Sequence, residues 1–312
     1  MNRKKLKYGV IGSGSWATAL IKILSENINE INWYIRNTNN IDFIKNNCHN
    51  PNYLSAVELK LNKLNISANI SEVAKKSDVI ITMVSDDIAL REVTLGAEGV
   101  MENARANSTY IDMSTVSPGL SSEISKVASN KNINYLRAPV NGTVMQAETS
   151  NLVILVSGPR ETFEEQQNTF KILGNKIFYT GQEEQARYLK LSINMMVGIS
   201  AVMMAEALTL GKAGGLEWNS MIEIIKNSAV GSPVINYKEQ MLKERDFEPA
   251  FSAKQMAKDF DLILEAGRSG NIPLSIAAQT RQSWSSMIAT GRGEKDYFGY
   301  IELLEEMSGL KN

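Results

Sequence analysis

Apolar residues in the first half of the chain gather in short runs, and the segments between the runs show helical spacing. Most of the runs are too apolar to be half exposed, which is typical of strands buried on both faces of a parallel sheet. They cover residues 8–11, 31–35, 79–84, 109–113, 134–136 and 152–157, with helical patterns at 16–27, 71–76 and 119–129. This alternation predicts βαβ units around one sheet.

The second half of the chain shows helical spacing alone after about Thr180. The helical patterns cover residues 182–212, 217–227, 254–266 and 276–287. At about 1.5 Å per residue, the first of these predicts a helix on the order of 45 Å long. We therefore predict an α/β fold with a Rossmann-type doubly wound parallel sheet in residues 1–181. An all-helical substrate and oligomerisation domain, linked by the long helix, follows in residues 182–312.

Lys190 and Asn194 interrupt the apolar surface of the long predicted helix. Four positions apart, they lie on one helix face, whereas most of their neighbours are apolar. A helix that is apolar almost all round is expected to be buried, so its rare polar groups need partners or a function. A buried ammonium can donate a proton, although a lysine in a helix is more often a solvated surface residue.

Composition and charge limit the classes of function. The 312 residues are 43% hydrophobic and 21% charged, with a formal net charge of −1, so no broad attraction to nucleic acid or an anionic membrane is expected. Lys190, Asn194 and Glu206 interrupt the longest apolar stretch, which argues against a membrane span. Cys48 is the only cysteine and His49 the only histidine, too few ligands for a metal site. With a basic start at residues 2–7 that lacks a signal-peptide pattern, these features predict a cytoplasmic protein.

The first predicted strand runs into a glycine turn and then a helix, in the pattern G-x-G-x-x-A. Gly12 permits the tight turn, Gly14 lets the backbone approach a pyrophosphate, and the small Ala17 allows close helix packing. The helix N-terminus supplies N–H groups to the phosphates. The pattern predicts a dinucleotide site at Gly12, Ser13, Gly14, Ser15, Trp16 and Ala17.

The second predicted strand ends in Arg36, Asn37 and Thr38, where an NAD site normally offers an acidic residue to the ribose. No acid is present, and the Arg36 guanidinium suits a 2′-phosphate. These three residues are therefore predicted cofactor contacts, with NADP (NADPH) favoured and NAD possible. The alternative is an ordinary surface arginine at a strand end.

Five motifs follow one another between Thr82 and Asp259, from about Ser85 onward. They are Thr82-Met-Val-Ser-Asp86, Asp112-Met-Ser-Thr-Val-Ser-Pro118, Ala138-Pro-Val-Asn-Gly-Thr143, Leu189-Lys-Leu-Ser-Ile-Asn194, and Phe251 followed by Lys258-Asp259. In this part the chain resembles the β-hydroxyacid dehydrogenase family, which includes 3-hydroxyisobutyrate dehydrogenase and the glyoxylate/succinic semialdehyde reductases. The resemblance implies a reversible, nicotinamide-dependent oxidation of a small hydroxy acid by a homodimer or homotetramer.

The resemblance also implies roles for individual residues. Lys190 matches the catalytic general acid, and Asn194 matches the residue that holds the lysine or the substrate. The implied substrate-binding residues are Thr115, Asn141, Gly142, Thr143, Phe251 and Asp259, and the implied cofactor contacts are Met83, Val84, Thr115 and Lys258. One departure concerns residues 141–143, because the family loop usually begins Ser-Gly; an amide at Asn141 can still donate to a substrate carboxylate.

The first 77 residues resemble a different family, bacterial glycerol-3-phosphate dehydrogenase. Residues 12–19, 32–37 and 49–54 carry this likeness, so the chain reads as two families joined near the strand at 78–84. That family uses NAD or NADP. Three alternatives therefore remain open at this point: a glycerol-3-phosphate dehydrogenase, an imine reductase, and a catalytically silent nucleotide-binding protein.

Overall fold

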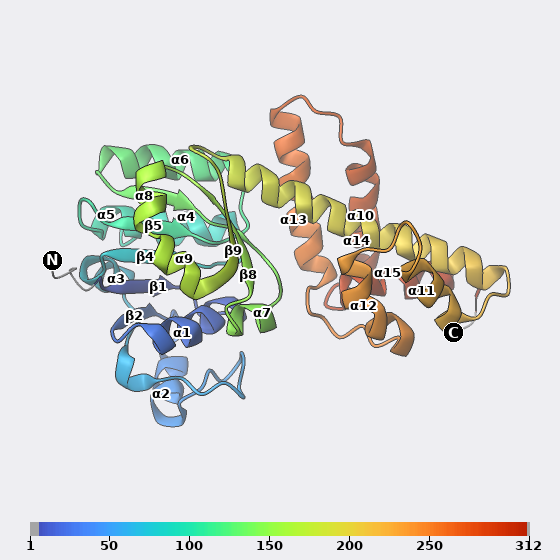
Figure 1. Ribbon diagram of the computed structural model, residues 1–312, viewed down its shortest axis with the longest axis horizontal. Helices are drawn as coiled ribbons and strands as arrows, with labels where there is room; N and C mark the ends of the chain where they lie inside the picture. Colours follow the sequence, from blue (N-terminus) through green and yellow to red (C-terminus); the bar gives the residue numbers. More distant parts are fainter. Residues whose placement is uncertain (1–5, 311–312) are drawn as a thin grey trace. The chain divides into compact units, whose positions relative to one another are not determined.

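The computed structural model describes residues 6–310 and divides into two compact units, Met1–Lys190 and Leu191–Asn312. Unit 1 is an α/β domain with one large sheet, and unit 2 consists of helices (Figure 1). The predicted fold class is thus confirmed. The division falls inside the long helix, whereas the predicted boundary preceded it at residues 181/182. Most of the basic start at residues 2–7 lies outside the described residues.

The sheet of unit 1 has the strand order β3-β2-β1-β4-β5-β6-β8-β7, and β9 pairs with β8. Strands β1 to β6 are parallel to their neighbours, as are β8 and β9, whereas β8 runs antiparallel to β6 and β7. The strands are β1 (Tyr8–Ile11), β2 (Ile31–Tyr34), β3 (Leu64–Ser67), β4 (Val79–Thr82), β5 (Thr109–Asp112), β6 (Asn134–Arg137), β7 (Val140–Asn141), β8 (Leu152–Ser157) and β9 (Gly174–Gly181).

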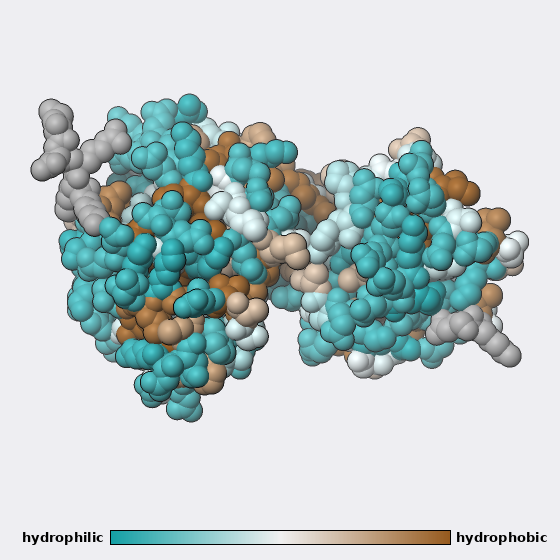
Figure 2. Space-filling view, turned by 60° about the horizontal axis from the view of Figure 1, so that its bottom comes forward, coloured by the Kyte–Doolittle hydropathy of each residue, from teal (hydrophilic) through white to brown (hydrophobic). Residues whose placement is uncertain are grey.

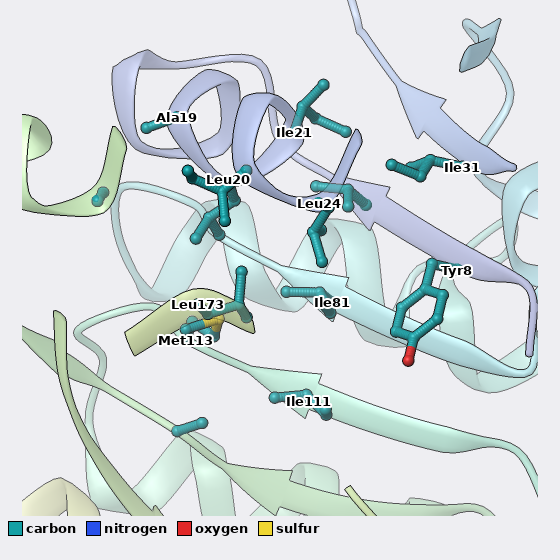
Figure 3. Close-up of a cluster of buried hydrophobic side chains, with 14 of the residues drawn as sticks. Tyr8, Ala19, Leu20, Ile21, Leu24, Ile31, Ile81, Ile111, Met113 and Leu173 are labelled. Atoms are coloured by element: carbon teal, nitrogen blue, oxygen red, sulfur yellow. The ribbon is translucent and has the colours of Figure 1, made fainter. Parts of the chain in front are cut away.

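Helices cover both faces of this sheet, and successive strand residues alternate between the two cores. Ile81 and Ile111 face the core under α1, whereas Ile80 and Tyr110 face the core under α3 to α6. In Figure 3, Leu20 extends from α1 toward the strands that carry Ile81 and Ile111. The helices are α1 (Ser15–Asn27), α2 (Thr38–Asn47), α3 (Ile70–Lys76), α4 (Asp87–Leu95), α5 (Val100–Asn103), α6 (Pro118–Asn130), α7 (Val144–Glu148), α8 (Arg160–Glu165) and α9 (Gln167–Leu173).

Unit 2 packs its helices around Phe260, Trp284 and Phe298, which are almost fully buried. Helix α13 begins at a capping box of Ser252 and Gln255, which satisfies two backbone N–H groups. The helices are α10 (Gln185–Ala213), which begins in unit 1, α11 (Trp218–Lys226), α12 (Pro233–Glu244), α13 (Ala253–Ser269), α14 (Ser275–Ala289) and α15 (Tyr300–Met307).

Helix α10 is less buried than its composition predicted. Leu191 and Leu208 are buried in the core of unit 2, but Met196, Met203 and Leu210 are 67%, 48% and 76% exposed. The prediction failed because composition records how apolar a helix is and not what covers it. By length and composition alone α10 is also apolar enough to cross a membrane, a test that core helices of soluble proteins pass too. On the face drawn in Figure 2, both units present a mostly polar surface with scattered apolar patches.

Candidate cofactor and catalytic site

The predicted cofactor residues follow the carboxyl ends of β1, β2 and β4. Strand order reverses between β1 and β4, and ligands of doubly wound sheets bind at such a switch point. The main-chain N–H of Met83 donates to Ile11 O at 3.0 Å, so the turns after β1 and β4 start side by side. The predicted residues at these two turns therefore lie close together.

The glycine turn has the geometry that a dinucleotide requires. Gly12 has φ +140°, and a Cβ there would lie 2.3 Å from Met83 O and 3.1 Å from the Cβ of Ala17. A side chain is thus excluded by conformation and by space. At Gly14 an added Cβ would meet nothing within 4 Å, and no side chain caps the N-terminus of α1. The turn therefore leaves room and uncapped N–H groups for a phosphate, so these residues fit a nicotinamide dinucleotide.

Arg36 lies at the carboxyl end of β2 and is exposed. Burial raises the pKa of Tyr34, and the positive charge of Arg36 opposes that rise. The structure of residues 6–310 gives Arg36 no ion pair. Asn37 caps α2 by accepting from Asn39 N at 2.9 Å, and Thr38 begins that helix. Arg36 is therefore available to an anion, whereas the side-chain oxygen of Asn37 is engaged.

The turns after β4 and β5 are joined by Ser114. Its buried hydroxyl accepts from Val84 N at 3.0 Å, and its own N–H donates to Asp112 Oδ1 at 3.1 Å. Thr115 follows directly and is partly exposed. Met83, Val84 and Thr115 are thus held at one edge of the sheet, beside the glycine turn.

Arg187 was missed by the sequence analysis. It is buried in the first turn of α10, where it forms a close ion pair with Asp112 and donates to Ser114 O at 2.6 Å and Tyr135 Oη at 3.1 Å. Burial is the largest single influence and lowers the pKa of Arg187, but the Asp112 carboxylate, Tyr135 and Glu184 together outweigh burial and raise the pKa. The ion pair fixes the start of α10 to the turn that carries Thr115. The only sequence signal was a charge three positions before Lys190 in an apolar stretch.

Lys190 lies beside Asn141, one of the predicted substrate-binding residues. Lys190 Nζ donates to Asn141 Oδ1 at 3.0 Å, and the lysine is partly buried. Gly142 has φ +141°, which favours glycine, and the next residue, Thr143, is the N-cap of α7. The hydroxyl and N–H of Thr143 both bond Gln146 in a capping box, so in this conformation Thr143 is occupied in holding the helix.

Asn194 lies one turn beyond Lys190 on α10, and within unit 2 it meets two other predicted residues. Its Nδ2 donates to Asp259 Oδ2 at 2.5 Å, and Lys258 Nζ lies 2.8 Å from Asp259 Oδ1. Asp259 is almost fully buried, and these two contacts offset the cost of burying its charge. Asn194, Lys258 and Asp259 therefore form one polar cluster.

Phe251 is held apart from that cluster in an aromatic group. Its ring meets Tyr297 edge-on at 6.2 Å, and its backbone N–H donates to Asp296 Oδ2 at 3.4 Å. Asp296 is fully buried and pairs with Lys238 at 2.6 Å. This second buried ion pair, also missed by the sequence analysis, fixes the segment that carries Phe251.

The described residues contain no group of three or more His, Cys, Asp or Glu side chains placed to hold a metal ion.

A surface hollow lies at the amino end of β1 between Tyr8, Asn27 and Thr169, and none of the predicted site residues lines it. The hollow is therefore not the predicted site, which follows the carboxyl ends of the strands.

Comparison with known proteins assigns each part of the chain to a family model. Residues 7–181 match the NAD binding domain of 6-phosphogluconate dehydrogenase, and residues 185–304 match the model described as NAD-binding of NADP-dependent 3-hydroxyisobutyrate dehydrogenase. The chain is 34% identical over 243 residues to 2-(hydroxymethyl)glutarate dehydrogenase of Eubacterium barkeri, covering 78% of this chain and 81% of that protein.

A second relative is glyoxylate/succinic semialdehyde reductase 1 of Arabidopsis thaliana. It is 31% identical over 235 residues, which cover 75% of this chain and 81% of that protein. Among solved structures, 3-hydroxyisobutyrate dehydrogenase of Mycobacterium tuberculosis with L-serine matches with a TM-score of 0.83 at 19% identity, over 96% of this chain and 99% of that one. At that identity the structural likeness establishes the fold alone.

Proposed function

The chain belongs to the β-hydroxyacid dehydrogenase family, and on this premise we propose that it reduces a small carboxylate-bearing aldehyde or keto acid with NADPH. It is an oxidoreductase that acts on CH–OH groups with a nicotinamide cofactor. The substrate class, the preference for NADPH and the roles of individual residues are the proposal.

The observation that carries the proposal is the hydrogen bond from Lys190 Nζ to Asn141 Oδ1 at 3.0 Å. The cofactor, when bound, supplies or accepts the hydride. As negative charge develops on the substrate oxygen, the ammonium of Lys190 stabilises it and donates a proton. Asn141 orients Lys190 through its amide oxygen, and that bond does not use the Nδ2 hydrogens. These can donate to a substrate carboxylate, as can the hydroxyl of Thr115.

The preference for NADPH rests on Arg36. A planar guanidinium can bond two oxygens of a phosphate, and β2 ends without the acidic residue that would bind the ribose hydroxyls of NAD. Arg36 is exposed at that strand end, so an incoming phosphate displaces no carboxylate from it.

The proposed substrate class follows the names of the two curated relatives described above. 2-(Hydroxymethyl)glutarate, glyoxylate and succinic semialdehyde all carry a carboxylate beside or near the reacting group. Three polar groups of this chain, at Thr115, Asn141 and Lys190, suit such an anion. Asn141 stands where the family loop usually has serine, so we expect the acid preference to differ from that of the relatives.

The test follows the oxidation of NADPH and NADH in parallel with glyoxylate, succinic semialdehyde, 3-oxo acids and dihydroxyacetone phosphate. We expect turnover of a carboxylate-bearing aldehyde or keto acid with NADPH. Lys190→Ala should lower kcat by about 10²- to 10⁴-fold and leave cofactor binding unchanged, whereas Lys254→Ala, at an exposed ion pair, is the matched control. Retained turnover in Lys190→Ala would exclude the assigned general acid.

Turnover of dihydroxyacetone phosphate instead would support the resemblance of the first 77 residues to glycerol-3-phosphate dehydrogenase, which stays a prediction. Cofactor binding without any oxidation would favour the silent nucleotide-binding alternative. The panel separates the two enzymatic outcomes, because its substrates differ in the group that the site must bind: a carboxylate or a phosphate. Calorimetry with NADPH and NADH detects cofactor binding where no oxidation occurs.

We also propose that the chain self-associates through α10. Leu189, Met196, Met203 and Leu210 are exposed and recur every seven residues, so they form one stripe along the helix. A second copy presents an identical stripe, and a two-fold axis would pair the two. Met203→Glu should shift the sedimentation coefficient toward the monomer, whereas Ile88→Glu, at an exposed apolar residue of unit 1, should not. A wild-type monomer would exclude this proposal.

A further inference from the structure

Three consecutive carbonyl groups of the glycine turn each accept a hydrogen bond from a side chain. Trp33 Nε1 donates to Gly12 O at 2.8 Å, Asn50 Nδ2 to Ser13 O at 3.3 Å, and Thr18 Oγ1 to Gly14 O at 2.9 Å. We call Trp33, Asn50 and Thr18 the turn clamp. Trp33 and Asn50 lie outside the fingerprint that predicted the cofactor site, and Thr18 directly follows it.

Asn50 is the member of the turn clamp with the most hydrogen bonds. Its side chain is 1% exposed, and both its Nδ2 group and its Oδ1 atom are hydrogen-bonded. Its Nδ2 group also donates to Thr18 Oγ1 at 2.9 Å, and its Oδ1 accepts from Asn52 N at 3.0 Å. The opposite amide orientation would point Oδ1 at the oxygen of Ser13, so the network permits one arrangement. Buried polar groups are costly unless they are satisfied in this way.

The segment that carries Asn50 is itself closed. Leu59 N donates to Cys48 O at 2.7 Å, and the Leu59 side chain is buried in the core of unit 1. Asn50 is therefore presented by a closed loop that is anchored in the core.

The clamp determines where the N–H groups of the turn point. In a trans peptide the C=O of one residue and the N–H of the next point in opposite directions, and the described residues contain no cis peptide bond. Holding the carbonyls of residues 12–14 to the protein therefore directs the N–H groups of residues 13–15 to the other side. At Gly14 on the turn, the space around an added Cβ is open.

We propose that Trp33, Asn50 and Thr18 are positioning residues that preset the N–H groups of residues 13–15 for the pyrophosphate of the cofactor. The inference rests on the proposed function only in taking the ligand to be a nicotinamide dinucleotide. Because the unbound turn is already ordered, binding costs less conformational entropy, and the gain is in affinity.

The first experiment measures NADPH dissociation constants by calorimetry for the wild type, Asn50→Ala and Asn52→Ala. Asn50→Ala removes three neutral hydrogen bonds, two of which reach the turn clamp and the turn, and the loss of those two should raise Kd about tenfold. Asn52→Ala is the matched control, because this exposed neighbour contributes only its backbone N–H to the network. In turnover assays, the cofactor KM of Asn50→Ala should rise while kcat stays within about twofold, since saturating cofactor restores the turn.

A second pair of variants separates positioning from folding. Thr18→Val removes the hydroxyl at nearly constant volume and should weaken NADPH binding, whereas Thr18→Ser keeps the hydroxyl and should restore it. With NADPH bound, amide hydrogen exchange at residues 13–15 should be faster in Asn50→Ala and Thr18→Val than in the wild type, because their N–H groups are then less well placed to bond the pyrophosphate. Exchange elsewhere in unit 1 should be unchanged. A general loss of stability would accelerate exchange across unit 1 instead.

The outcomes distinguish this inference from the proposed function. If the wild type binds neither NADPH nor NADH, both fail. If it binds one of them and Asn50→Ala binds it equally well with unchanged exchange at residues 13–15, the turn clamp is overturned and the proposed function stands. If exchange accelerates uniformly in Asn50→Ala, its role is structural and the positioning role is likewise overturned.

Discussion

Each compact unit buries an ion pair beside residues predicted to bind substrate, but the two pairs use different cations. In unit 1, Arg187 and Asp112 are 1% and 0% exposed, and in unit 2, Lys238 and Asp296 are 2% and 0% exposed. Arg187 donates hydrogen bonds to a carboxylate, two carbonyls and two hydroxyls. A planar guanidinium held at several points fixes direction as well as distance.

Lys238 is a point charge in an aromatic surrounding. The rings of Tyr237, Tyr297 and Phe298 lie 5.4, 5.1 and 5.6 Å from its Nζ, and Asp296 also accepts from the backbone N–H of Phe298 at 3.1 Å. Burial lowers the pKa of Lys238, and the Asp296 charge opposes only part of that. Equal burial therefore does not imply an equal role. Arg187 orients several groups, whereas Lys238 neutralises a single carboxylate, that of Asp296.

The largest expected effect is the loss of stability in Arg187→Met. The substitution leaves the Asp112 carboxylate buried without its cation, which typically costs about 3–5 kcal/mol. The free energy of unfolding of unit 1 is measured in urea, with hydrogen exchange of its strands as the signal. Arg160→Met, at an exposed pair with Glu164, is the control and should change stability by less than about 1 kcal/mol. If Arg187→Met also loses less than about 1 kcal/mol, the buried Arg187–Asp112 pair is no more important for stability than an exposed pair.

Lys238→Met should cost less, about 1–3 kcal/mol, because Lys238 bonds a single carboxylate and methionine can fill the aromatic surrounding. The loss of Arg187 also removes the donor of buried carbonyl and hydroxyl groups. The measurement is urea unfolding, monitored by hydrogen exchange of α13 and α14, which pack in the core of unit 2. If Lys238→Met proves as harmful as Arg187→Met, the two pairs are equivalent and the number of bonds per cation does not matter.

The third prediction separates the pairs by kinetics. Arg187→Lys keeps the charge but loses the fork that fixes the start of α10, and we expect kcat to fall about tenfold through misplacement of Lys190, with the cofactor KM unchanged. Asp296→Asn should instead raise the substrate KM about threefold through the segment that carries Phe251, with little change in kcat. If both variants change kcat and KM equally, Arg187 does not act through Lys190 and Asp296 does not act through the segment that carries Phe251.

Local patterns account for what the sequence predicted well. Strands β1 and β8 begin and end as expected, and the glycine turn follows β1, because each depends on residues adjacent in the chain. Strand β3 and most of β9 are half exposed and mixed in polarity, so no apolar run marks them. The short helices α4, α5, α7, α8 and α9 carry too few turns for a clear period.

The missed site residues depend on long-range contacts. Arg187 meets Asp112 across 75 positions, and Asn50 meets Ser13 across 37. Nothing adjacent to either residue indicates the partner. The family resemblance did bring Lys190 and Asn141, 49 positions apart, into one predicted site, and the structure places them 3.0 Å apart. Neither the local sequence patterns nor the family resemblance predicted the residues that hold such a site in position.

A partly exposed ion cluster on α11 and α12 contrasts with the buried pairs, and its loss should have the smallest effect on stability. Lys226 and Lys243 donate to Glu239 at 2.8 and 2.7 Å and lower the pKa of its carboxyl to about 2. Because this pKa lies below that of the unfolded chain, the cluster stabilises the fold at neutral pH. That contribution is lost as the pH falls from about 4.5 toward 2.

The difference in unfolding free energy between wild type and Glu239→Gln should therefore be constant near neutral pH and shrink over that acid range. It should also shrink with added salt, since water and ions screen exposed charges. Glu244→Gln, on the same helix but bonded to Gln240, is the control and should show neither trend. A difference that persists at low pH would mean that Glu239 contributes by packing, as a buried residue does, and the contrast between exposed and buried pairs would lose its electrostatic basis.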